Sequence, residues 1–500
     1  MAGEAVHLPG REVPGRGYSL VLVARAAGDP AAAVGWVAAD PVGAVSGLAR
    51  KLPHYTRYSY LAFKGSAPDN VAKGMWKPLS SPLVLNLGQG ELPGLESPSR
   101  KPLTPLPPSF DPARLEAAVR YLADPRLEGR GLGTPGLAEA TRWVEKRLAE
   151  AQLRPTGNHG FRQSFTWDGG PGHHDLELTN LVGMVPGTDP SLAPVLVTAH
   201  LDHLGRGWPD VRAGNEGKIH PGADDNASGV AVLLELARAM ASEPHRPRPV
   251  VFAVTTGEEA GLVGARHLMA HFPGRKPPFA CLNIDTVGRL REGKLYVLNT
   301  DSAREWRYLW MGVAMTTGAP VTMVSEPLDS SDQGACLERG IPAVQLFSGP
   351  TPDYHRPTDT TDKIDSAGMA TVAEAAHEAL TYLAGRREPL TVTIQGAGAP
   401  PAGRGRGKAG PKTRKVSLGT MPDFGYGGAG VRVARVLDGS PAAAAGIQAG
   451  DILVALDGRP ISGLRDFSET LKAHAPGDTV RLTLRRGTET IQLTATLAPR

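Results

Sequence analysis

Short apolar segments alternate with helical segments between residues 110 and 385, and this alternation limits the fold more than any other feature of the chain. The expected strands are Val195–Thr198, Pro249–Thr255, Phe279–Ile284 and Ile341–Phe347, and the expected helices include Ala227–Met240, Leu262–His271, Ala303–Met315 and Ser366–Leu383. Apolar strands that alternate with helices are typical of a largely parallel sheet with helices on both faces. The sequence therefore predicts an α/β sandwich in this region.

The rest of the chain differs in residue composition and pattern, and a length of 500 residues is enough for two to four domains. Residues 1–90 form a region of unknown role and unclear fold, with strand-like segments at Tyr18–Ala26 and Tyr58–Phe63. Residues 91–108 are rich in proline and indicate a stiff linker. We expect the α/β domain at residues 109–388, a Gly/Pro/Arg-rich linker at 389–415 and a small β-rich domain at 416–500.

Composition excludes some classes of function. The 54 basic and 50 acidic side chains nearly balance, so we expect no nucleic-acid partner. No apolar stretch approaches the roughly 20 residues that span a bilayer, and the first residues lack the pattern of a signal peptide. We expect a soluble, unexported chain as written, while a signal lost upstream stays open. Cys281 is most simply a buried apolar residue, and one disulfide with Cys336 also stays open.

Three of the expected strands are each followed directly by potential metal ligands. They are His200, the pair Glu258 and Glu259, and Asp285. Because the carboxyl ends of strands in such sheets meet at one crevice, we expect these side chains to converge, together with Asp225 and His355 from two loops. Imidazole and carboxylate without thiolate suit zinc in an open catalytic site, and one carboxylate can bridge two ions roughly 3.5–4 Å apart.

Six motifs occur in one order along this segment: AHLDH, PGADDNASG, TGEEAGLVGA, LNIDTVG, SSDQGA and YHRPTDT. With them, residues 110–385 resemble the dizinc aminopeptidase family, the zinc exopeptidases that include bacterial leucyl aminopeptidases and glutamate carboxypeptidase. The resemblance implies a zinc exopeptidase-like fold, two zinc ions and removal of N-terminal residues from peptides. It also suggests a secreted or periplasmic location, which the visible N-terminus does not support.

The resemblance further implies a role for each site residue. His200 and Asp285 would hold one zinc, Glu259 and His355 would hold the other, and Asp225 would bridge them. Glu258 would be the general base that takes a proton from the bridging water. Asp202 would hydrogen-bond the far nitrogen of His200. The family pattern also suggests a cis peptide bond between Asp225 and Asn226.

Several neighbouring residues are harder to interpret. Gln333 stands where relatives often carry His or Tyr, at a position expected to border the substrate. Tyr354, next to His355, is a hypothesis for the residue that stabilises the oxyanion. His203 is a candidate for an outer position at the metal site, although a structural role is the simpler interpretation. We expect Asp359 to order its own loop and Asp224 to cap a helix.

The last 85 residues or so resemble bacterial PDZ domains, over GSPAAAAGIQAGDILVALDGRPI and LRDFSETLKAHAPGDTVRLTLRRG. The expected strands are Val431–Val436, Ile452–Leu456, Val480–Leu484 and Ile491–Thr496. Such domains pair an extended peptide with a sheet edge and hold its terminal carboxylate in a backbone nest, here predicted at Leu418 and Gly419. The partners would be peptides or protein C-termini, unless the domain is an accessory that no longer binds them.

Three functions are consistent with these patterns. The first is a zinc-dependent aminopeptidase. The second is a single-zinc relative that acts on another amide or cyclises an N-terminal glutamine. The third is an inactive protein that binds peptides through its PDZ-like domain. Because the expected ligands and the base are all present, we favour the first function.

Overall fold

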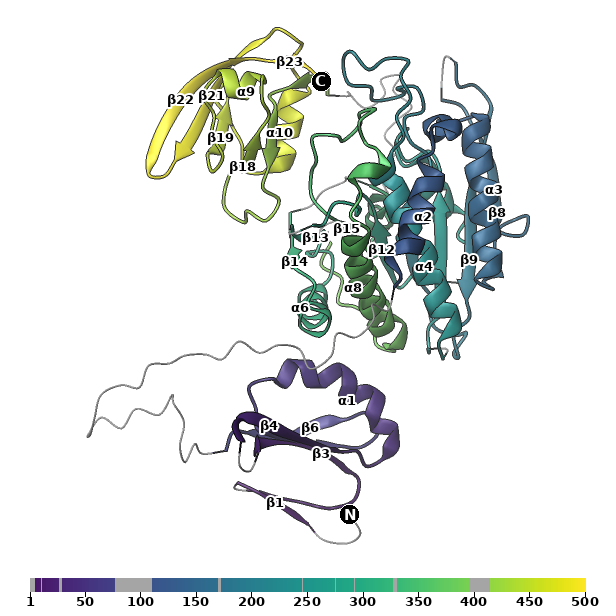
Figure 1. Ribbon diagram of the computed structural model, residues 1–500, viewed down its shortest axis with the longest axis vertical. Helices are drawn as coiled ribbons and strands as arrows, with labels where there is room; N and C mark the ends of the chain where they lie inside the picture. Colours follow the sequence, from purple (N-terminus) through teal and green to yellow (C-terminus); the bar gives the residue numbers. More distant parts are fainter. Residues whose placement is uncertain are drawn as a thin grey trace. The chain divides into compact units, whose positions relative to one another are not determined.

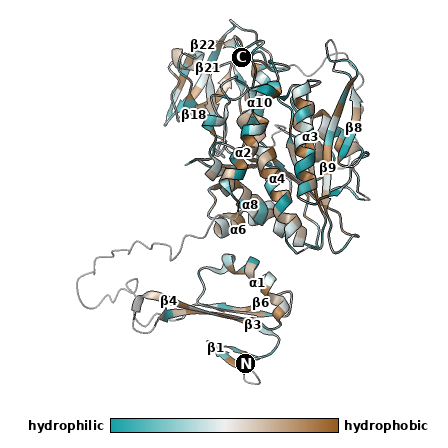
Figure 2. Ribbon diagram, turned by 45° about the vertical axis from the view of Figure 1, so that its right-hand side comes forward, coloured by the Kyte–Doolittle hydropathy of each residue, from teal (hydrophilic) through white to brown (hydrophobic). Residues whose placement is uncertain are grey.

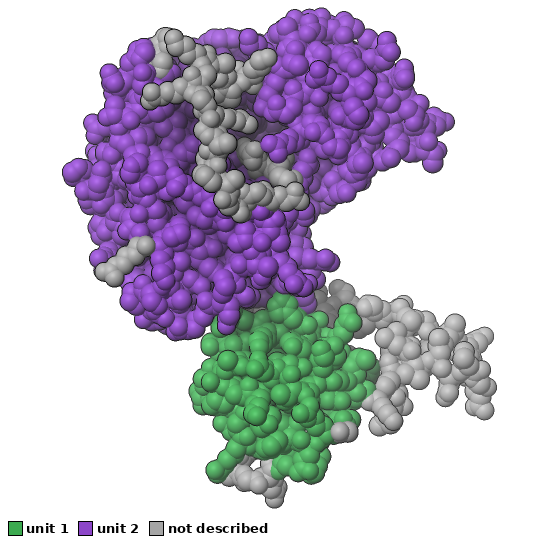
Figure 3. Space-filling view, turned by 180° about the vertical axis from the view of Figure 1, so that it is seen from behind, with its two compact units in different colours: residues 1–107 green, residues 108–500 purple. Residues whose placement is uncertain are grey.

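The computed structural model describes residues 5–9, 11–26, 29–76, 110–169, 172–244, 246–274, 276–291, 293–326, 331–394 and 414–500. The chain forms two compact units, Met1–Pro107 and Pro108–Arg500 (Figure 3). The whole linker predicted at 91–108 and most of the linker predicted at 389–415 lie outside the described residues.

The first unit is built on a four-stranded antiparallel sheet with the order β4-β3-β5-β6. Its elements are β1 (Val6–Leu8), β2 (Arg11–Val13), β3 (Tyr18–Ala26), β4 (Asp29–Ala38), α1 (Val45–Lys51), β5 (Tyr60–Lys64) and β6 (Asp69–Gly74). Successive strand residues point to opposite faces, so Leu20 packs with the β1-β2 hairpin while Val21 packs with Leu48 of α1. The region of unclear fold is thus a sheet covered on both faces.

The second unit contains, within its described residues, a nine-stranded sheet with the order β14-β13-β15-β12-β10-β11-β9-β7, and β8 pairs with β9. The strands are β7 (Arg154–Pro155), β8 (Arg162–Trp167), β9 (Leu176–Val185), β10 (Val195–His200), β11 (Val250–Thr255), β12 (Ala280–Ile284), β13 (Leu295–Leu298), β14 (Val321–Met323) and β15 (Ala343–Phe347). The four central strands β11, β10, β12 and β15 are parallel, as predicted, while β9 and β13 flank them in antiparallel pairs.

Helices cover both faces of this sheet. One layer, labelled in Figure 1, holds α2 (Pro112–Leu122), α3 (Pro135–Glu150), α4 (Gly229–Ser242), α8 (Ser366–Gly385) and, packed on α8, α6 (Trp306–Thr317). The other layer holds α5 (Val263–Ala270) and α7 (Gln333–Leu337). Along β10, Val195 and Val197 join the larger core and Leu196 the smaller one. Hydrophobic and hydrophilic residues are interleaved along α3 because one side is buried (Figure 2).

The C-terminal part of the second unit is a β-rich domain with its own core. Its strands are β16 (Val416–Ser417), β17 (Thr420–Pro422), β18 (Val431–Val436), β19 (Ile452–Leu456), β20 (Arg459–Pro460), β21 (Thr479–Arg486), β22 (Glu489–Thr496) and β23 (Ala498–Pro499), with helices α9 (Pro441–Ala444) and α10 (Leu464–Leu471). Phe424 packs this domain against Phe347 of β15, with ring centroids 5.4 Å apart. No helix in the described part of the chain has the length and apolar character of a membrane span.

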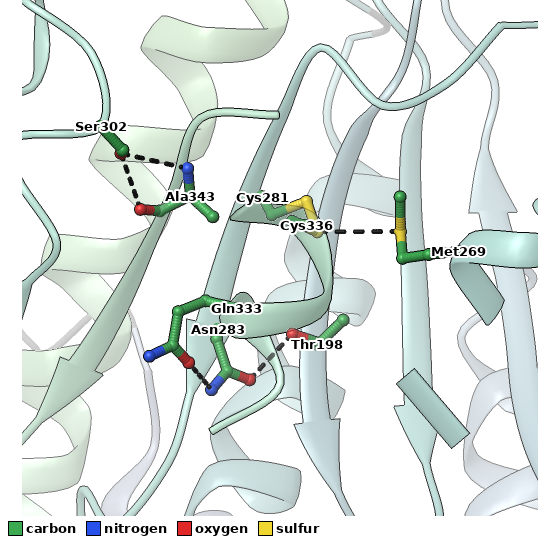
Figure 4. The surroundings of a disulfide bond; sticks show 8 residues. All are labelled: Thr198, Met269, Cys281, Asn283, Ser302, Gln333, Cys336 and Ala343. Carbon is green, nitrogen blue, oxygen red and sulfur yellow. Dashed lines mark hydrogen bonds between the residues drawn. A yellow bond between two sulfur atoms is a disulfide. The ribbon is translucent and has the colours of Figure 1, made fainter. Parts of the chain in front are cut away.

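A disulfide bond joins Cys281 of β12 to Cys336 of α7 (Figure 4). The sulfur of Met269, on α5, lies 3.8 Å from that of Cys336. The pairing that the sequence left open is therefore present, and it links α7 covalently to the central strand β12.

Candidate metal centre

The predicted ligands do converge at the carboxyl end of the parallel strands. His200 is the last residue of β10, and Asp285 directly follows β12. Nε2 of His200 lies 3.3 Å from Oδ1 of Asp225 and 3.4 Å from Oδ1 of Asp285. These three buried side chains are close enough to share one cation.

A second group forms on the other side of Asp225. Nε2 of His355 lies 3.3 Å from Oδ2 of Asp225 and 3.3 Å from Oε2 of Glu259. The two oxygens of the Asp225 carboxylate therefore face two different imidazoles. This is the arrangement expected of a carboxylate that is shared by two neighbouring metal ions.

These side chains fit a pair of zinc ions in both chemistry and hydrogen bonding. Each group combines imidazole with carboxylate and contains no thiolate, a donor set that suits catalytic zinc. Nε2 of His355 is buried and has no hydrogen-bond partner among the described residues. A buried nitrogen without a partner is costly, and coordination of a cation would satisfy it.

The loop that carries Asp225 is held by Asp359. The carboxylate of Asp359 accepts hydrogen bonds from the backbone N–H groups of Asp224, at 2.9 Å, and Asp225, at 3.1 Å. The peptide bond between Asp225 and Asn226 is cis, as predicted. Asp224 does not cap a helix, because its carboxylate accepts from the N–H of Gly288 at 2.7 Å. Asp359 thus orders the neighbouring ligand loop, whereas the sequence predicted that it orders its own.

The contact predicted between Asp202 and His200 differs from the one observed. Nδ1 of His200 lies 3.1 Å from the main-chain carbonyl of Asp202, whereas the nearest carboxylate oxygen is 4.0 Å away. That carboxylate accepts instead from the backbone N–H groups of Glu258, at 3.2 Å, and Glu259, at 3.4 Å. Asp202 therefore fixes the ligand-bearing turn after β11, and its main chain orients the imidazole.

The concentration of acidic groups controls the protonation of the site. Burial opposes a charged ring at His200, but Asp285 and Glu258 outweigh it and raise the pKa of His200 well above its ordinary value. Burial also opposes ionisation of Asp225, yet the surrounding imidazoles hold its pKa well below the usual range. Burial, reinforced by Glu259 and Asp285, raises the pKa of Glu258 well above that of a free glutamate despite His200.

His203 lies inside the site, where the sequence favoured a structural role. Its Nδ1 is 2.8 Å from Oε1 of Glu259, and its ring is fully buried. Nε2 of His203 has no hydrogen-bond partner among the described residues. The ring of His203 therefore orients Glu259. This is the outer role at the metal site that the sequence analysis gave as the alternative to a structural one.

Two residues of this site were missed at the sequence level. Oδ2 of Asp210 lies 2.9 Å from Nδ1 of His355 and so orients this imidazole. Arg130 is fully buried and donates to the carbonyls of Leu201, Pro221 and Gly222, which belong to the two ligand loops. Neither residue occupies a strand end or a recognisable motif. The only available signal was the general need of a metal-bound histidine for an outer partner.

The remaining predicted residues have varied locations. Gln333, which the sequence predicted to border the substrate, is buried, and its carbonyl accepts from the amide of Asn283 (Figure 4). Its own amide donates to Gln345 at 3.0 Å. Tyr354 stacks on the His355 ring with centroids 3.9 Å apart and lines a cavity beside Asp285. Gly419 lines the same cavity, whereas Leu418 is buried in the core of the β-rich domain.

Comparisons with known proteins give similarities for two parts of this chain. Residues 180–380 match peptidase family M28, and residues 409–497 match the PDZ domain. The chain is 29% identical over 214 residues to aminopeptidase YwaD of Bacillus subtilis, covering 40% of this chain and 43% of the relative. It is 28% identical over 206 residues to a probable leucine aminopeptidase of Arthroderma otae, covering 39% and 55%. The chain spans about half the length of these curated relatives.

Among solved structures, the chain resembles the LapA aminopeptidase of Legionella pneumophila, with 20% identity and a TM-score of 0.45 over 56% of this chain and 73% of that one. It also resembles the glutaminyl cyclase of Porphyromonas gingivalis, with 17% identity and a TM-score of 0.46 over 55% of this chain and 99% of that one.

Proposed function

We propose that this chain, which carries a peptidase family M28 domain at residues 180–380 and a PDZ domain at residues 409–497, is a zinc-dependent aminopeptidase. The observation that carries the proposal is the Asp225 carboxylate, whose two oxygens lie 3.3 Å from Nε2 of His200 and of His355. A carboxylate shared by two imidazoles serves the binding of two metal ions, and a protein that only binds peptides does not need it.

Two zinc ions would be held by His200 and Asp285 on one side of Asp225, and by Glu259 and His355 on the other. When bound, such ions lower the pKa of a coordinated water and polarise a carbonyl group. His203 and Asp210 keep the second pair of ligands in place through their contacts with Glu259 and His355.

Glu258 is the residue that moves the proton. Its raised pKa makes the carboxylate a stronger base than a free glutamate. It can therefore take a proton from the attacking water and deliver it to the amine that leaves when the peptide bond breaks. Asp202 fixes the backbone at Glu258 and so limits where the carboxylate can reach.

The direction of attack on the peptide is part of the same proposal. The bound ions would offset the charges of Asp225, Glu259 and Asp285, so a general negative potential does not orient the substrate. A zinc ion or a nearby carboxylate would instead hold the free N-terminal amine, and cleavage next to it would release a single residue.

The test combines a metal count with a substrate panel. We expect the purified full chain to bind two zinc ions and to hydrolyse aminoacyl amides and anilides, and we expect chelation to abolish hydrolysis until zinc is restored. One bound zinc together with cyclisation of N-terminal glutamine peptides would support the single-zinc alternative. A zinc-loaded protein that releases amine from no substrate would support the inactive binding protein.

A further inference from the structure

A cavity of about 530 Å³ connects the metal centre with the PDZ domain inside the second unit. Asp285, Thr286 and Tyr354 line it on the peptidase side. Ser417, Gly419 and Ser440 line it on the side of the PDZ domain. Its volume lies within the roughly 300–1,000 Å³ typical of small-ligand sites, so it has room for a ligand of a few residues.

The loop before β17 is shaped to form this wall. Gly419 has a φ of +80°, and an added Cβ would lie 2.1 Å from Cβ of Ser440. Its carbonyl accepts a hydrogen bond from the N–H of Leu437 at 2.9 Å. Only glycine fits this position. The backbone at Gly419 therefore packs directly against Ser440, and both residues line the cavity.

Four arginines line the cavity: Arg212, Arg356, Arg414 and Arg500. Arg500 is paired, since its guanidinium lies 2.9 Å from Asp210. None of the other three forms an ion pair with a carboxylate of the described residues. Each of the three is only partly exposed. Arg414 donates a hydrogen bond to the carbonyl of Val416, and Arg212 lies over the ring of Tyr354. The cavity thus holds guanidinium groups that are only partly open to water and form no ion pair with a carboxylate of the described residues.

The positive charges in the cavity lie close enough together to lower one another's pKa values. Burial, together with the nearby Arg500, lowers the pKa of Arg212 to about 10. Burial likewise lowers the pKa of Arg414 to about 10, with contributions from Arg500 and Arg212. A positive cluster of this kind is stabilised by an anion, and guanidinium groups match a carboxylate in geometry as well as in charge.

From these observations, and resting on the proposed function, we infer that Arg212, Arg356 and Arg414 bind the C-terminal carboxylate of a short free peptide. The N-terminal bond of that peptide would lie at the metal centre beside Asp285, and residues of the PDZ domain such as Ser417 and Gly419 would lie at the far end of the cavity. The proposed substrate class is therefore free peptides of a few residues.

The test compares two forms of one peptide on the full-length protein. The tripeptide Leu-Gly-Gly is assayed as the free acid and as its C-terminal amide, with leucyl p-nitroanilide as a separate substrate. Because a hydrogen bond to a charged group contributes about 10- to 100-fold in affinity, we expect kcat/KM to be about 10- to 100-fold higher for the acid. Equal values for the two forms, with the anilide hydrolysed, would overturn the inference and leave the proposed function intact.

Variants assign the effect to the arginines. In Arg212→Gln and Arg414→Gln we expect the ratio of the acid to the amide to fall toward one. The exposed Arg435 on β18 supplies the matched control, and Arg435→Gln is expected to keep the ratio. Since both forms are measured on the same preparation, partial loss of folded protein cancels in this ratio. An unchanged ratio in both cavity variants would contradict the inference.

A binding measurement removes turnover from the test. We expect calorimetric titration of the zinc-loaded Glu258→Gln protein to show the acid form binding about 10- to 100-fold more tightly than the amide. If neither form binds in the cleft, but an N-acetylated peptide with a free C-terminus raises anilide hydrolysis, the cavity recognises the C-terminus of a partner protein instead. That outcome would also overturn the short-peptide inference.

Discussion

Oδ2 of Asp210 lies 2.9 Å from Nδ1 of His355, so a carboxylate orients the imidazole whose other nitrogen faces the second proposed metal site. The same oxygen lies 2.9 Å from the guanidinium of Arg500, which belongs to the β-rich C-terminal domain. The side chain of Asp210 therefore connects this domain with a proposed zinc ligand. The two domains of the second unit are thus linked next to the proposed metal centre.

Replacing Asp210 should weaken metal binding. In Asp210→Asn the amide cannot supply the negative charge that strengthens His355 as a ligand, and we expect zinc affinity to fall about 10- to 100-fold. Competition with a chromogenic chelator measures this change. The exposed Glu216 lies in the same loop, and Glu216→Gln is expected to leave the affinity unchanged. Equal affinities in Asp210→Asn and wild type would show that Asp210 has no such role.

Glu258 should be needed for turnover but not for zinc. We expect Glu258→Gln to lose about 10²- to 10⁴-fold in kcat, because the amide cannot accept the proton of the attacking water. Its metal content should stay at the wild-type level. The control is Glu177→Gln, an exposed residue of β9. A variant that retained wild-type turnover would exclude Glu258 as the base, and one that lost zinc would point to a role as a ligand.

The sequence predicted the residues whose positions follow from topology. His200, Glu259 and Asp285 follow parallel strands, and the carboxyl ends of neighbouring parallel strands meet at one edge. The sequence did not predict Asp210, because its position depends on how a long loop folds back over His355. The antiparallel strand β9 was also missed, since its position beside β11 depends on tertiary pairing that local patterns do not specify.

Zinc binding should release protons and grow stronger as pH rises. Burial favours a neutral His355, but Glu259, Asp210 and Asp225 outweigh it and raise its pKa to about 10. Near neutral pH the metal-free ring therefore holds a proton, which zinc must displace because only the neutral imidazole is a ligand. We expect zinc affinity to increase between about pH 6 and 9.

Calorimetric titrations in two buffers with different ionisation enthalpies measure the number of released protons. Apparent binding enthalpies that are the same in both buffers would show that no proton is displaced, contrary to this expectation. In the Asp210→Asn protein the pKa of His355 loses one of the contributions that raise it, so we expect fewer protons to be released at the same pH.

The disulfide between Cys281 and Cys336 should stabilise the second unit by restricting its unfolded chain. The two cysteines are 55 positions apart, and closing a loop of that length contributes about 4 kcal/mol in the chain-entropy description. We expect the double variant Cys281→Ala/Cys336→Ala to unfold at lower urea concentration than the wild type. Each single variant controls for the lost packing, because both side chains are buried. Two thiols that react in the denatured, unreduced protein would show that this bond does not form.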